Sequence, residues 1–431
     1  MSDGDDKIVD LETEKRKRGR PKKKEAPRFN WSADLMVDGE SGKLINCLAN
    51  IVRAFRIAPD LKGALALNEM SGQIEVLRPL PTVESASARQ SGRTIDDIDA
   101  VQLTEWLQVE AKWPALTVRA VKEGIVAASA ENRFHPVRSY LDGIVWDGKP
   151  RVGGWLADYL CAPRAVYENT IGMMWLVSAV ARVMRPGCQA DYMIVLEGAQ
   201  GLGKSSALRV LGGEFFTDSL PHDLSSKDTS IGLRGAWIVE IAEMASMSNA
   251  DSNVLKAWIT KRTERFRPPF GTFDVKEPRQ SVLAGTINPN GIGYLKDETG
   301  NRRFWPVQVG RADIERLKRD RDQLWAEAVR LYRSGVHWWP DSQFEKRVFT
   351  PKQEERREQD AWSDPIQEWL RGEVSATSFD VAKGALNLPS SHITQGTQRR
   401  IVKILRSLGW VPGKRSGKSG SFTFERGNEN G

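Results

Sequence analysis

The sequence has few cysteines and no long apolar run, and each shortage excludes a class of protein. Cys47, Cys161 and Cys188 are the only cysteines and form no CxxC pair, which argues against a disulfide framework and a zinc site. The longest apolar run, residues 171–181, is about half the length that spans a bilayer. The opening residues, MSDGDDKIVD, lack the apolar core of a secretory signal. We therefore expect a cytoplasmic protein without a membrane segment.

The length and composition are those of a folded protein with several units. The chain has 431 residues, of which 40% are hydrophobic and 28% charged, so we expect two or three folded units plus tails. The net charge is +7, and its excess lies at the ends: residues 15–28 hold nine basic residues and one acidic, and residues 371–426 hold ten and three. This distribution predicts polyanion contacts at both ends, or simply solvated charge.

The first 150 residues carry no recognisable catalytic motif. Residues 1–30 lack apolar periodicity and predict a disordered basic arm. Within it Arg18 and Arg20, in RGRP, resemble the core of an AT-hook, which lies in an A·T minor groove; the alternative is a tail that seeks phosphates without sequence preference. Residues 31–150 show helical spacing and predict a mainly helical accessory domain.

A complete phosphate-binding motif follows. Residues 192–196 (YMIVL) predict a buried strand, residues 198–205 read GAQGLGKS, and a helical pattern continues to Leu211. Glycines let backbone N–H groups turn toward phosphate oxygens, while the lysine reaches the β- and γ-phosphates and the serine ligates Mg²⁺. We predict an ATP site with Mg²⁺, formed by Gly198, Gln200, Gly201, Gly203, Lys204, Ser205 and Ser206.

Polar residues at the ends of two later apolar segments complete this site. Glu240 ends the segment AWIVE, and Glu243 lies three residues on. We expect Glu240 to hold Mg²⁺ and Glu243 to polarise the attacking water, with an exchange of roles or a surface acidic pair as alternatives. Asn288 ends a third segment, where its amide could orient that water, although asparagine before proline is also an ordinary turn residue.

Two adjacent arginines precede another apolar segment. Arg302 or Arg303, in GNRRFWPV, is a candidate for an arginine finger that enters the nucleotide site of a neighbouring subunit. A surface basic pair is the alternative.

Taken together, these residues resemble the virulence-associated protein E family, which consists of phage- and prophage-encoded ATPases related to superfamily 3 helicases. The resemblance covers roughly residues 135–340 and rests on ordered blocks such as LEGAQGLGKS, GAWIVEIAEM and GTINPNGIGYLKDETGNRRFWPV. It implies an α/β, AAA+-like ATPase core over residues 151–345, a hexameric ring, and movement on single-stranded DNA. It also implies that Glu240 and Glu243 form the Walker B pair and that Asn288 is sensor 1.

In the related helicases a pore hairpin precedes the sensor residue. Lys276 or Phe270 is the corresponding candidate to line a DNA pore, and Arg265 and Arg267 are candidates for the pore or the subunit interface. No polymerase-type carboxylate cluster precedes the ATPase, so we expect a primase to be a separate partner.

The C-terminal residues have the pattern of a DNA-binding module. After a linker at 346–362, residues 363–431 predict three helices and a hairpin, as in a winged helix. Such modules bind DNA or protein, and the basic charge favours DNA. The candidate DNA contacts are Arg399, Arg400, Lys403 and Arg406 on or near the third helix and Lys414, Arg415 and Lys418 in the wing.

Three functions are compatible with these features. The first is an ATP-driven, helicase-type motor of phage or mobile-element DNA replication, with duplex at its basic ends. The second is an origin-binding initiator or regulatory ATPase that does not unwind DNA. A small-molecule kinase is disfavoured, because it needs neither a basic arm nor a finger supplied in trans.

Overall fold

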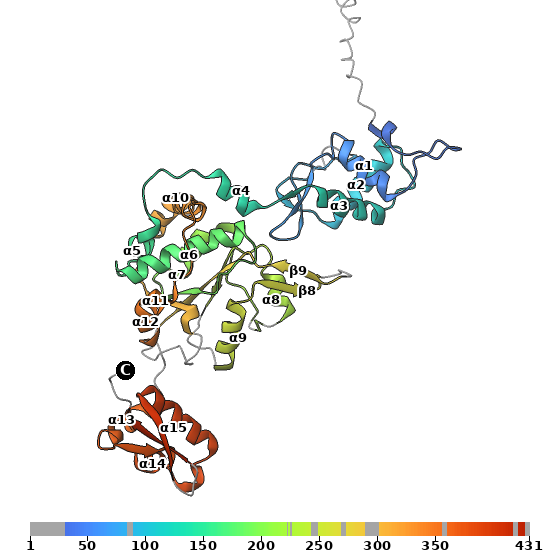
Figure 1. Cartoon of the computed structure of the whole chain (residues 1–431). Helices are drawn as coiled ribbons and strands as arrows, with labels where there is room; N and C mark the ends of the chain where they lie inside the picture. The colour runs from blue at the N-terminus through green and yellow to red at the C-terminus, as the bar shows by residue number, and fades with distance from the viewer. Residues whose placement is uncertain are drawn as a thin grey trace, which may run out of the picture. The chain divides into compact units, whose positions relative to one another are not determined.

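The computed structural model describes residues 31–83, 89–221, 223–224, 226–242, 249–268, 273–288, 301–355, 360–416 and 421–426. It divides into two compact units, Met1–Phe134 and His135–Gly431, each of which is described by itself (Figure 1). Among the described residues, no helix combines the length and apolarity needed to cross a membrane.

The first unit combines helices with a small sheet that the sequence analysis did not predict for residues 31–150. Its helical elements are η1 Trp31–Asp34, α1 Leu48–Ile57, α2 Asp97–Glu110 and α3 Val118–Glu131. Its strands, β1 Leu65–Asn68, β2 Ile74–Val76, β3 Arg93–Thr94 and β4 Arg133–Phe134, form a sheet in the order β3-β2-β1-β4. These strands are two to four residues long, too short for an alternating pattern to reveal them.

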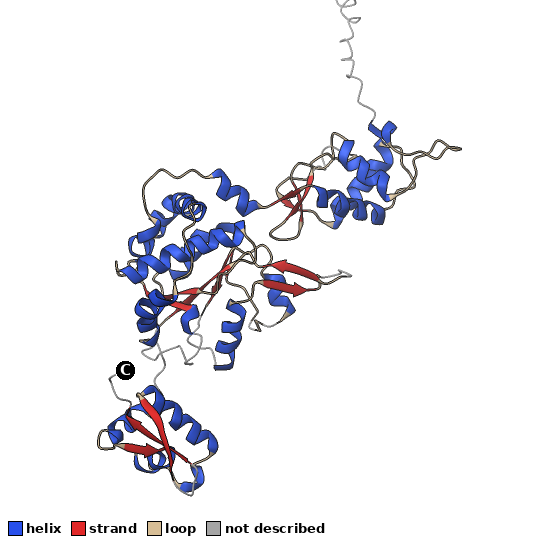
Figure 2. Cartoon of the chain, viewed as in Figure 1, coloured by secondary structure: helices blue, strands red, loops and turns tan. Residues whose placement is uncertain are grey.

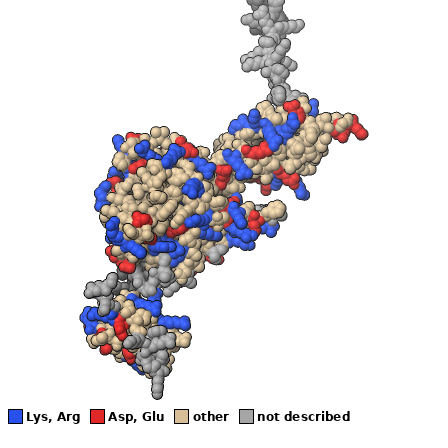
Figure 3. Space-filling model, in the orientation of Figure 1, with Lys and Arg blue, Asp and Glu red and all other residues tan. Residues whose placement is uncertain are grey.

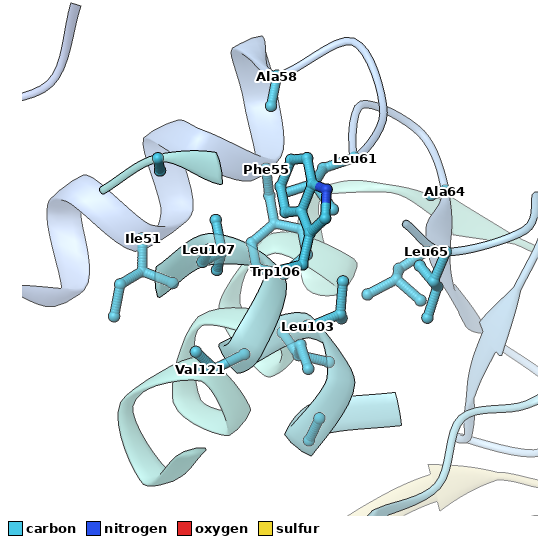
Figure 4. Close-up of a cluster of buried hydrophobic side chains, with 14 of the residues drawn as sticks. Ile51, Phe55, Ala58, Leu61, Ala64, Leu65, Leu103, Trp106, Leu107 and Val121 are labelled. Carbon is cyan, nitrogen blue, oxygen red and sulfur yellow. The ribbon is translucent and has the colours of Figure 1, made fainter. Parts of the chain in front are cut away.

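The core of this unit joins the three helices to β1. Figure 4 shows Ile51 and Phe55 from α1, Leu103, Trp106 and Leu107 from α2, Val121 from α3 and Leu65 from β1 converging in one cluster. Trp31 stacks on Trp106, with ring centroids 6.1 Å apart. Asp96 begins α2 with a capping box that includes Asp99, which satisfies backbone donors left free at a helix start.

The boundary between the units lies before residues 135–150, whereas the sequence suggested a boundary after them. This segment packs on the second unit. His135 Nδ1 accepts the backbone N–H of Arg138, and its Nε2 hydrogen-bonds Gln280 at 2.5 Å. The backbone N–H of Asp147 donates to Gln323 of α10 at 2.8 Å. The contacts with Gln280 and Gln323 join residues far apart in the sequence, which explains why local composition did not place the boundary.

The second unit is built on a five-stranded sheet in the order β11-β5-β10-β7-β6, and every neighbouring pair in it is parallel. The strands are β5 Met193–Glu197, β6 Phe216–Thr217, β7 Ile238–Ile241, β10 Val282–Ile287 and β11 Phe304–Gln308. Residues of β5, β7 and β10 are all buried. A parallel sheet with buried central strands is covered on its faces by helices, and Figure 2 shows helices around these strands. The second unit therefore has a mixed α/β fold.

The helices of this unit are anchored to the sheet by buried tryptophans. They are α4 Pro136–Gly143, η3 Val152–Gly154, α5 Trp155–Leu160, α6 Val166–Met184, α7 Lys204–Gly212, η4 Gly213–Phe215, α8 Lys227–Gly232, α9 Asn249–Ile259, η6 Asn301–Arg303, α10 Ile314–Arg333, α11 Ser342–Phe344, the π-helical turn η7 Glu345–Phe349 and α12 Thr350–Glu354. Trp175 of α6 donates to Leu283 O at 2.9 Å, and Trp237 donates to Ala179 O at 2.9 Å. These bonds satisfy the indole N–H groups inside the core. The first joins α6 to β10, and the second joins α6 to the residue before β7.

A two-stranded antiparallel hairpin extends from the body of this unit (Figure 1). It consists of β8 Thr263–Phe266 and β9 Val275–Pro278, with Arg265 opposite Lys276. It lies in the chain between α9 and β10.

The C-terminal part contains three helices and a three-stranded antiparallel sheet. The elements are α13 Ser363–Leu370, β12 Ser375–Thr377, α14 Ser378–Gly384, η8 Ser390–His392, α15 Gln395–Ser407, β13 Trp410–Ser416 and β14 Ser421–Arg426, with strand order β12-β14-β13. Its core includes Ile366, Val381, Ile401, Leu405 and Phe424, which are at most 3% exposed.

Candidate active site

The candidate site begins at the loop between β5 and α7. Strand β5 ends at Glu197 and α7 begins at Lys204. Gly201 and Gly203 have φ values of +83° and +85°, a region that residues with a Cβ rarely adopt. A Cβ on Gly203 would also lie 3.2 Å from the Cβ of Ala312. The glycines therefore allow the backbone conformation of this loop, which leads directly into helix α7.

Lys204 lies at the centre of the loop. Its ammonium group donates to Gly198 O at 2.6 Å, to Ala199 O at 2.8 Å and to Asn288 Oδ1 at 2.8 Å. The residue is only 8% exposed. Burial lowers its pKa below the usual value, and the attraction of Glu240 opposes this effect. A buried cation with three oxygen partners is well suited to exchange them for phosphate oxygens.

The side-chain amide of Asn288 faces Lys204 with its oxygen atom. An ammonium group only donates hydrogen bonds, so the amide must direct its oxygen toward Lys204. Its NH₂ group therefore remains a donor. Asn288 directly follows β10, whose last residue, Ile287, accepts a hydrogen bond from the backbone of Gly198 at 3.2 Å. The expected sensor residue and the glycine loop thus meet at the carboxyl ends of β5 and β10.

Glu240 forms the second polar centre of the site. One of its oxygens, Oε1, accepts hydrogen bonds from Ser205 Oγ and Thr286 Oγ1, both at 2.6 Å. The residue is 2% exposed. Its other oxygen, Oε2, is buried without a hydrogen-bond partner among the described residues. A buried carboxylate oxygen without a partner is costly, so Oε2 is the position in this site that most needs a ligand.

The strand order explains why these residues meet. Strand β10 lies between β5 and β7, with Ala284 opposite Glu240 and Thr286 opposite Leu196. Thr286 lies two residues beyond Ala284, so its side chain is on the same face of the sheet as that of Glu240. Helix α7 then brings Ser205 to that face from the loop.

The residues present fit a magnesium–nucleotide complex. Mg²⁺ prefers oxygen ligands and is usually held by one or two carboxylates together with substrate phosphates, and the Ser205 hydroxyl and the unpartnered Glu240 oxygen have this chemistry. The loop backbone and the N-terminus of α7 suit an anion. Gln200 and Ser206 are exposed on the loop and in the first turn of α7, while Gly198 lies at the loop start.

Three other expected residues are not among those that meet at the loop in the described part of the chain. Glu243 is outside the described residues. Arg302 and Arg303 lie in η6, immediately before β11, whose first residue Phe304 is opposite Met193 at the start of β5. The glycine loop follows the other end of β5, at Glu197. The two ends of β5 are about 13 Å apart, at roughly 3.3 Å per residue. The arginines and the loop are thus at opposite ends of these two strands.

Apart from Arg400, the expected DNA contacts either lie outside the described residues or are exposed. Arg18, Arg20, Phe270 and Lys418 lie outside the described residues, as do the side chains of Lys414 and Arg415. Lys276 on β9 and Arg399, Lys403 and Arg406 on α15 are exposed. Lysine and arginine side chains are spread over the visible face, with acidic side chains among them (Figure 3).

Arg400 differs from its neighbours on α15. Its guanidinium makes two hydrogen bonds to Asp360, both at 2.7 Å, and lies 3.8 Å from the centre of the Trp362 ring. A guanidinium occupied by a carboxylate and an aromatic ring serves packing. Arg400 is therefore already engaged within the protein, whereas the other cations expected on this helix are not described with such partners.

Thr286 is the site residue that sequence reasoning missed. It is a polar residue near the end of an otherwise apolar strand, VLAGTI, and that position was the available signal. Threonine is also common in strands for its shape alone. Its role can be inferred only once the strand order places β10 beside β7, which carries Glu240.

The fold and the site define a mixed α/β protein in which a glycine loop and a strand-end carboxylate meet at the carboxyl edge of a parallel sheet. The chain belongs to the family with the virulence-associated protein E-like domain, whose model matches residues 141–359. This finding confirms the resemblance stated from the sequence.

Distant similarity extends to solved structures of the NrS-1 C-terminal region. The A form of its apo structure is 13% identical, with 67% of this chain and 78% of that chain covered and a TM-score of 0.38. The A form of residues 305–718 is 14% identical over the same shares, with a TM-score of 0.43. A further apo structure of residues 305–718 is 12% identical, covering 81% and 84% with a TM-score of 0.43. No curated protein matches the chain.

Proposed function

We propose that this protein is an ATP-driven DNA motor of the helicase type, with a P-loop ATPase core of the AAA+ kind, that acts in DNA replication of a phage or other mobile element. The observation that carries the proposal is the convergence of Lys204, Ser205, Glu240 and Asn288 at one edge of the parallel sheet. These four polar groups come from the start of α7 and from the ends of two strands, β7 and β10. They have no shared packing role there, but each matches a need of phosphate transfer.

Each residue has one task in the proposed hydrolysis. Lys204 exchanges its carbonyl partners for β- and γ-phosphate oxygens, and the amide NH₂ of Asn288 donates to the γ-phosphate or to the attacking water. Ser205 and Glu240 hold Mg²⁺, which supplies positive charge to the phosphate oxygens. Glu243 polarises the water. The oxygen of this water forms the new bond to the γ-phosphorus. The bond between the γ-phosphorus and the bridging oxygen breaks, and that oxygen leaves with ADP.

The arginines before β11 are proposed to act on a neighbouring subunit. Because Arg302 and Arg303 precede the opposite end of the strand pair, neither lies beside the loop of its own subunit. One of them completes the site of the next subunit in a head-to-tail ring. This arrangement supports a homo-oligomer, which we propose to be a hexamer.

DNA is proposed to bind at three places. Lys276 on the hairpin contacts a single strand in the pore. The C-terminal helices and sheet form a winged helix in which Arg399 and Lys403 contact duplex, with Lys414, Arg415 and Lys418 in the wing. The basic arm, with Arg18 and Arg20, adds a salt-sensitive contact to duplex. A separate primase supplies primers.

Strand displacement tests this proposal against its main alternative, an initiator or switch that binds ATP and DNA without unwinding. The full chain is incubated with ATP, Mg²⁺ and a fork whose displaced strand carries a fluorophore. We expect ATP-dependent release of the strand by the wild type and none by Lys204→Ala. ATP turnover stimulated by DNA without strand release would support the initiator instead.

A further inference from the structure

Thr286 makes a contact within the candidate site that no packing need explains. The residue is 6% exposed, and its hydroxyl donates to Glu240 Oε1 at 2.6 Å. A buried hydroxyl needs an acceptor, which a backbone carbonyl on the same element can supply. Thr104, for example, donates to Ala100 O at 2.7 Å within α2. Thr286 donates instead to the carboxylate on the neighbouring strand.

The two donors to Glu240 act on the same oxygen. Ser205 reaches Oε1 from α7 and Thr286 reaches it from β10. Together they fix the orientation of the carboxylate group, because turning it away from this orientation would break both hydrogen bonds. The oxygen that remains, Oε2, is the one without a partner among the described residues. Thr286 thus helps to set the direction in which the free oxygen points.

The hydroxyl of Ser205 can keep this bond while it binds a cation. A serine oxygen has two lone pairs beside its proton, so it can ligate Mg²⁺ and still donate to Oε1. Thr286 has no such second task. It lies on β10, the strand between β5 and β7.

We propose that Thr286 is a positioning residue that sets the orientation of Glu240 before the nucleotide arrives, so that Oε2 faces Mg²⁺ or a water bound to it. The inference rests on the proposed function, because it assigns a task within the same site. Thr286 itself touches neither nucleotide nor metal. Partners that hydrogen-bond a metal ligand raise metal affinity by about 10- to 100-fold in other proteins.

The test compares metal dependence with nucleotide binding. A non-hydrolysable ATP analogue with a fluorescent label is bound to the full chain, first in EDTA and then during a titration with Mg²⁺. We expect Thr286→Val to bind the analogue in EDTA as the wild type does, because Lys204 and the loop are intact. For this variant, the Mg²⁺ concentration that gives half of the maximal increase in affinity for the analogue should rise about 10-fold or more.

Two variants separate the hydroxyl from the shape of the side chain. Thr286→Ser keeps the donor and should have the Mg²⁺ dependence of the wild type. Thr104→Val makes the same substitution at another buried threonine, 4% exposed and in the first unit, and should leave the titration unchanged. If Thr286→Val does not fold, Thr286→Ala and Thr286→Ser provide the same comparison.

The inference is overturned if Thr286→Val keeps the Mg²⁺ dependence of the wild type, or if Thr286→Ser is as impaired as Thr286→Val. Failure of the proposed function has a different signature, because the wild type itself would then bind no ATP analogue with or without Mg²⁺.

Discussion

Arg279 and Glu264 form a buried ion pair, 2.5 Å apart, at the base of the hairpin, with side-chain exposures of 1% and 4%. Arg279 also donates to Trp258 O at 2.7 Å and lies over the Trp258 ring, and Ser230 donates to Glu264 at 2.7 Å. The pair therefore fastens the hairpin to α8 and α9. Arg279 lies three residues before β10, the strand that carries Thr286 and leads to Asn288.

Glu264→Gln should destabilise the second unit. The substitution leaves Arg279 buried without its counter-charge, which typically costs about 3–5 kcal/mol. The matched control is Asp274→Asn, which removes the exposed pair of Arg265 and Asp274 from the same hairpin and should cost at most about 1 kcal/mol. Denaturant unfolding of the full chain measures both. Equal effects of the two variants would contradict the assignment of the buried pair as the anchor.

The contribution of Glu264 should depend on pH. Burial alone would raise the pKa of Glu264, but Arg279, with hydrogen bonds from Lys261 and Ser230, outweighs it and the net pKa is lowered below 4.5. A carboxylate with a lowered folded-state pKa stabilises above its unfolded pKa and loses this effect as pH falls through the lowered value. The difference in unfolding free energy between wild type and Glu264→Gln should therefore be largest near neutral pH and shrink in acid. A difference independent of pH would contradict this account.

Mixing two inactive variants should restore turnover if the finger acts in trans. Lys204→Ala lacks the phosphate contact, and a chain with both Arg302→Ala and Arg303→Ala lacks the finger, whose loss costs about 10³-fold or more in rate. When equal amounts of the two variants assemble at random, about one quarter of the head-to-tail interfaces combine an intact Lys204 on one subunit with intact Arg302 and Arg303 on its neighbour. ATP turnover of the mixture is compared with that of each variant alone. Turnover no higher than the sum of the separate variants would exclude a shared site.

Substitutions on α15 should distinguish DNA contacts from packing. Arg399→Ala and Lys403→Ala each remove an exposed cation, so the slope of log affinity against log salt should fall by about one per lost phosphate contact. Arg400→Ala removes a side chain held by Asp360 and Trp362, and should lower stability while leaving the salt slope close to that of the wild type. Fluorescence anisotropy with a labelled duplex at several salt concentrations measures this. A larger slope change for Arg400→Ala than for Arg399→Ala would reverse the assignment.

Local motifs were predictable from the sequence, and long-range relationships were not. The glycine loop is one continuous segment whose residue types are dictated by the turn itself, and the family resemblance followed from such segments. Thr286, Glu264 and Arg279 acquire their roles only from strand order and burial. The short strands β2 and β3 were missed because they have too few residues to alternate. The ion pair of Arg400 with Asp360 could not be predicted, because charge alone does not reveal a partner forty residues away.

ATP turnover by wild type and Lys204→Ala, with and without single-stranded DNA, tests the central claim most directly. The ammonium group of Lys204 lies inside the glycine loop and beside Asn288. We expect Mg²⁺-dependent turnover by the wild type that single-stranded DNA stimulates, and turnover at background for Lys204→Ala, with duplex binding by that variant unchanged. Full turnover by Lys204→Ala, or none by the wild type with both Mg²⁺ and DNA present, would contradict the account.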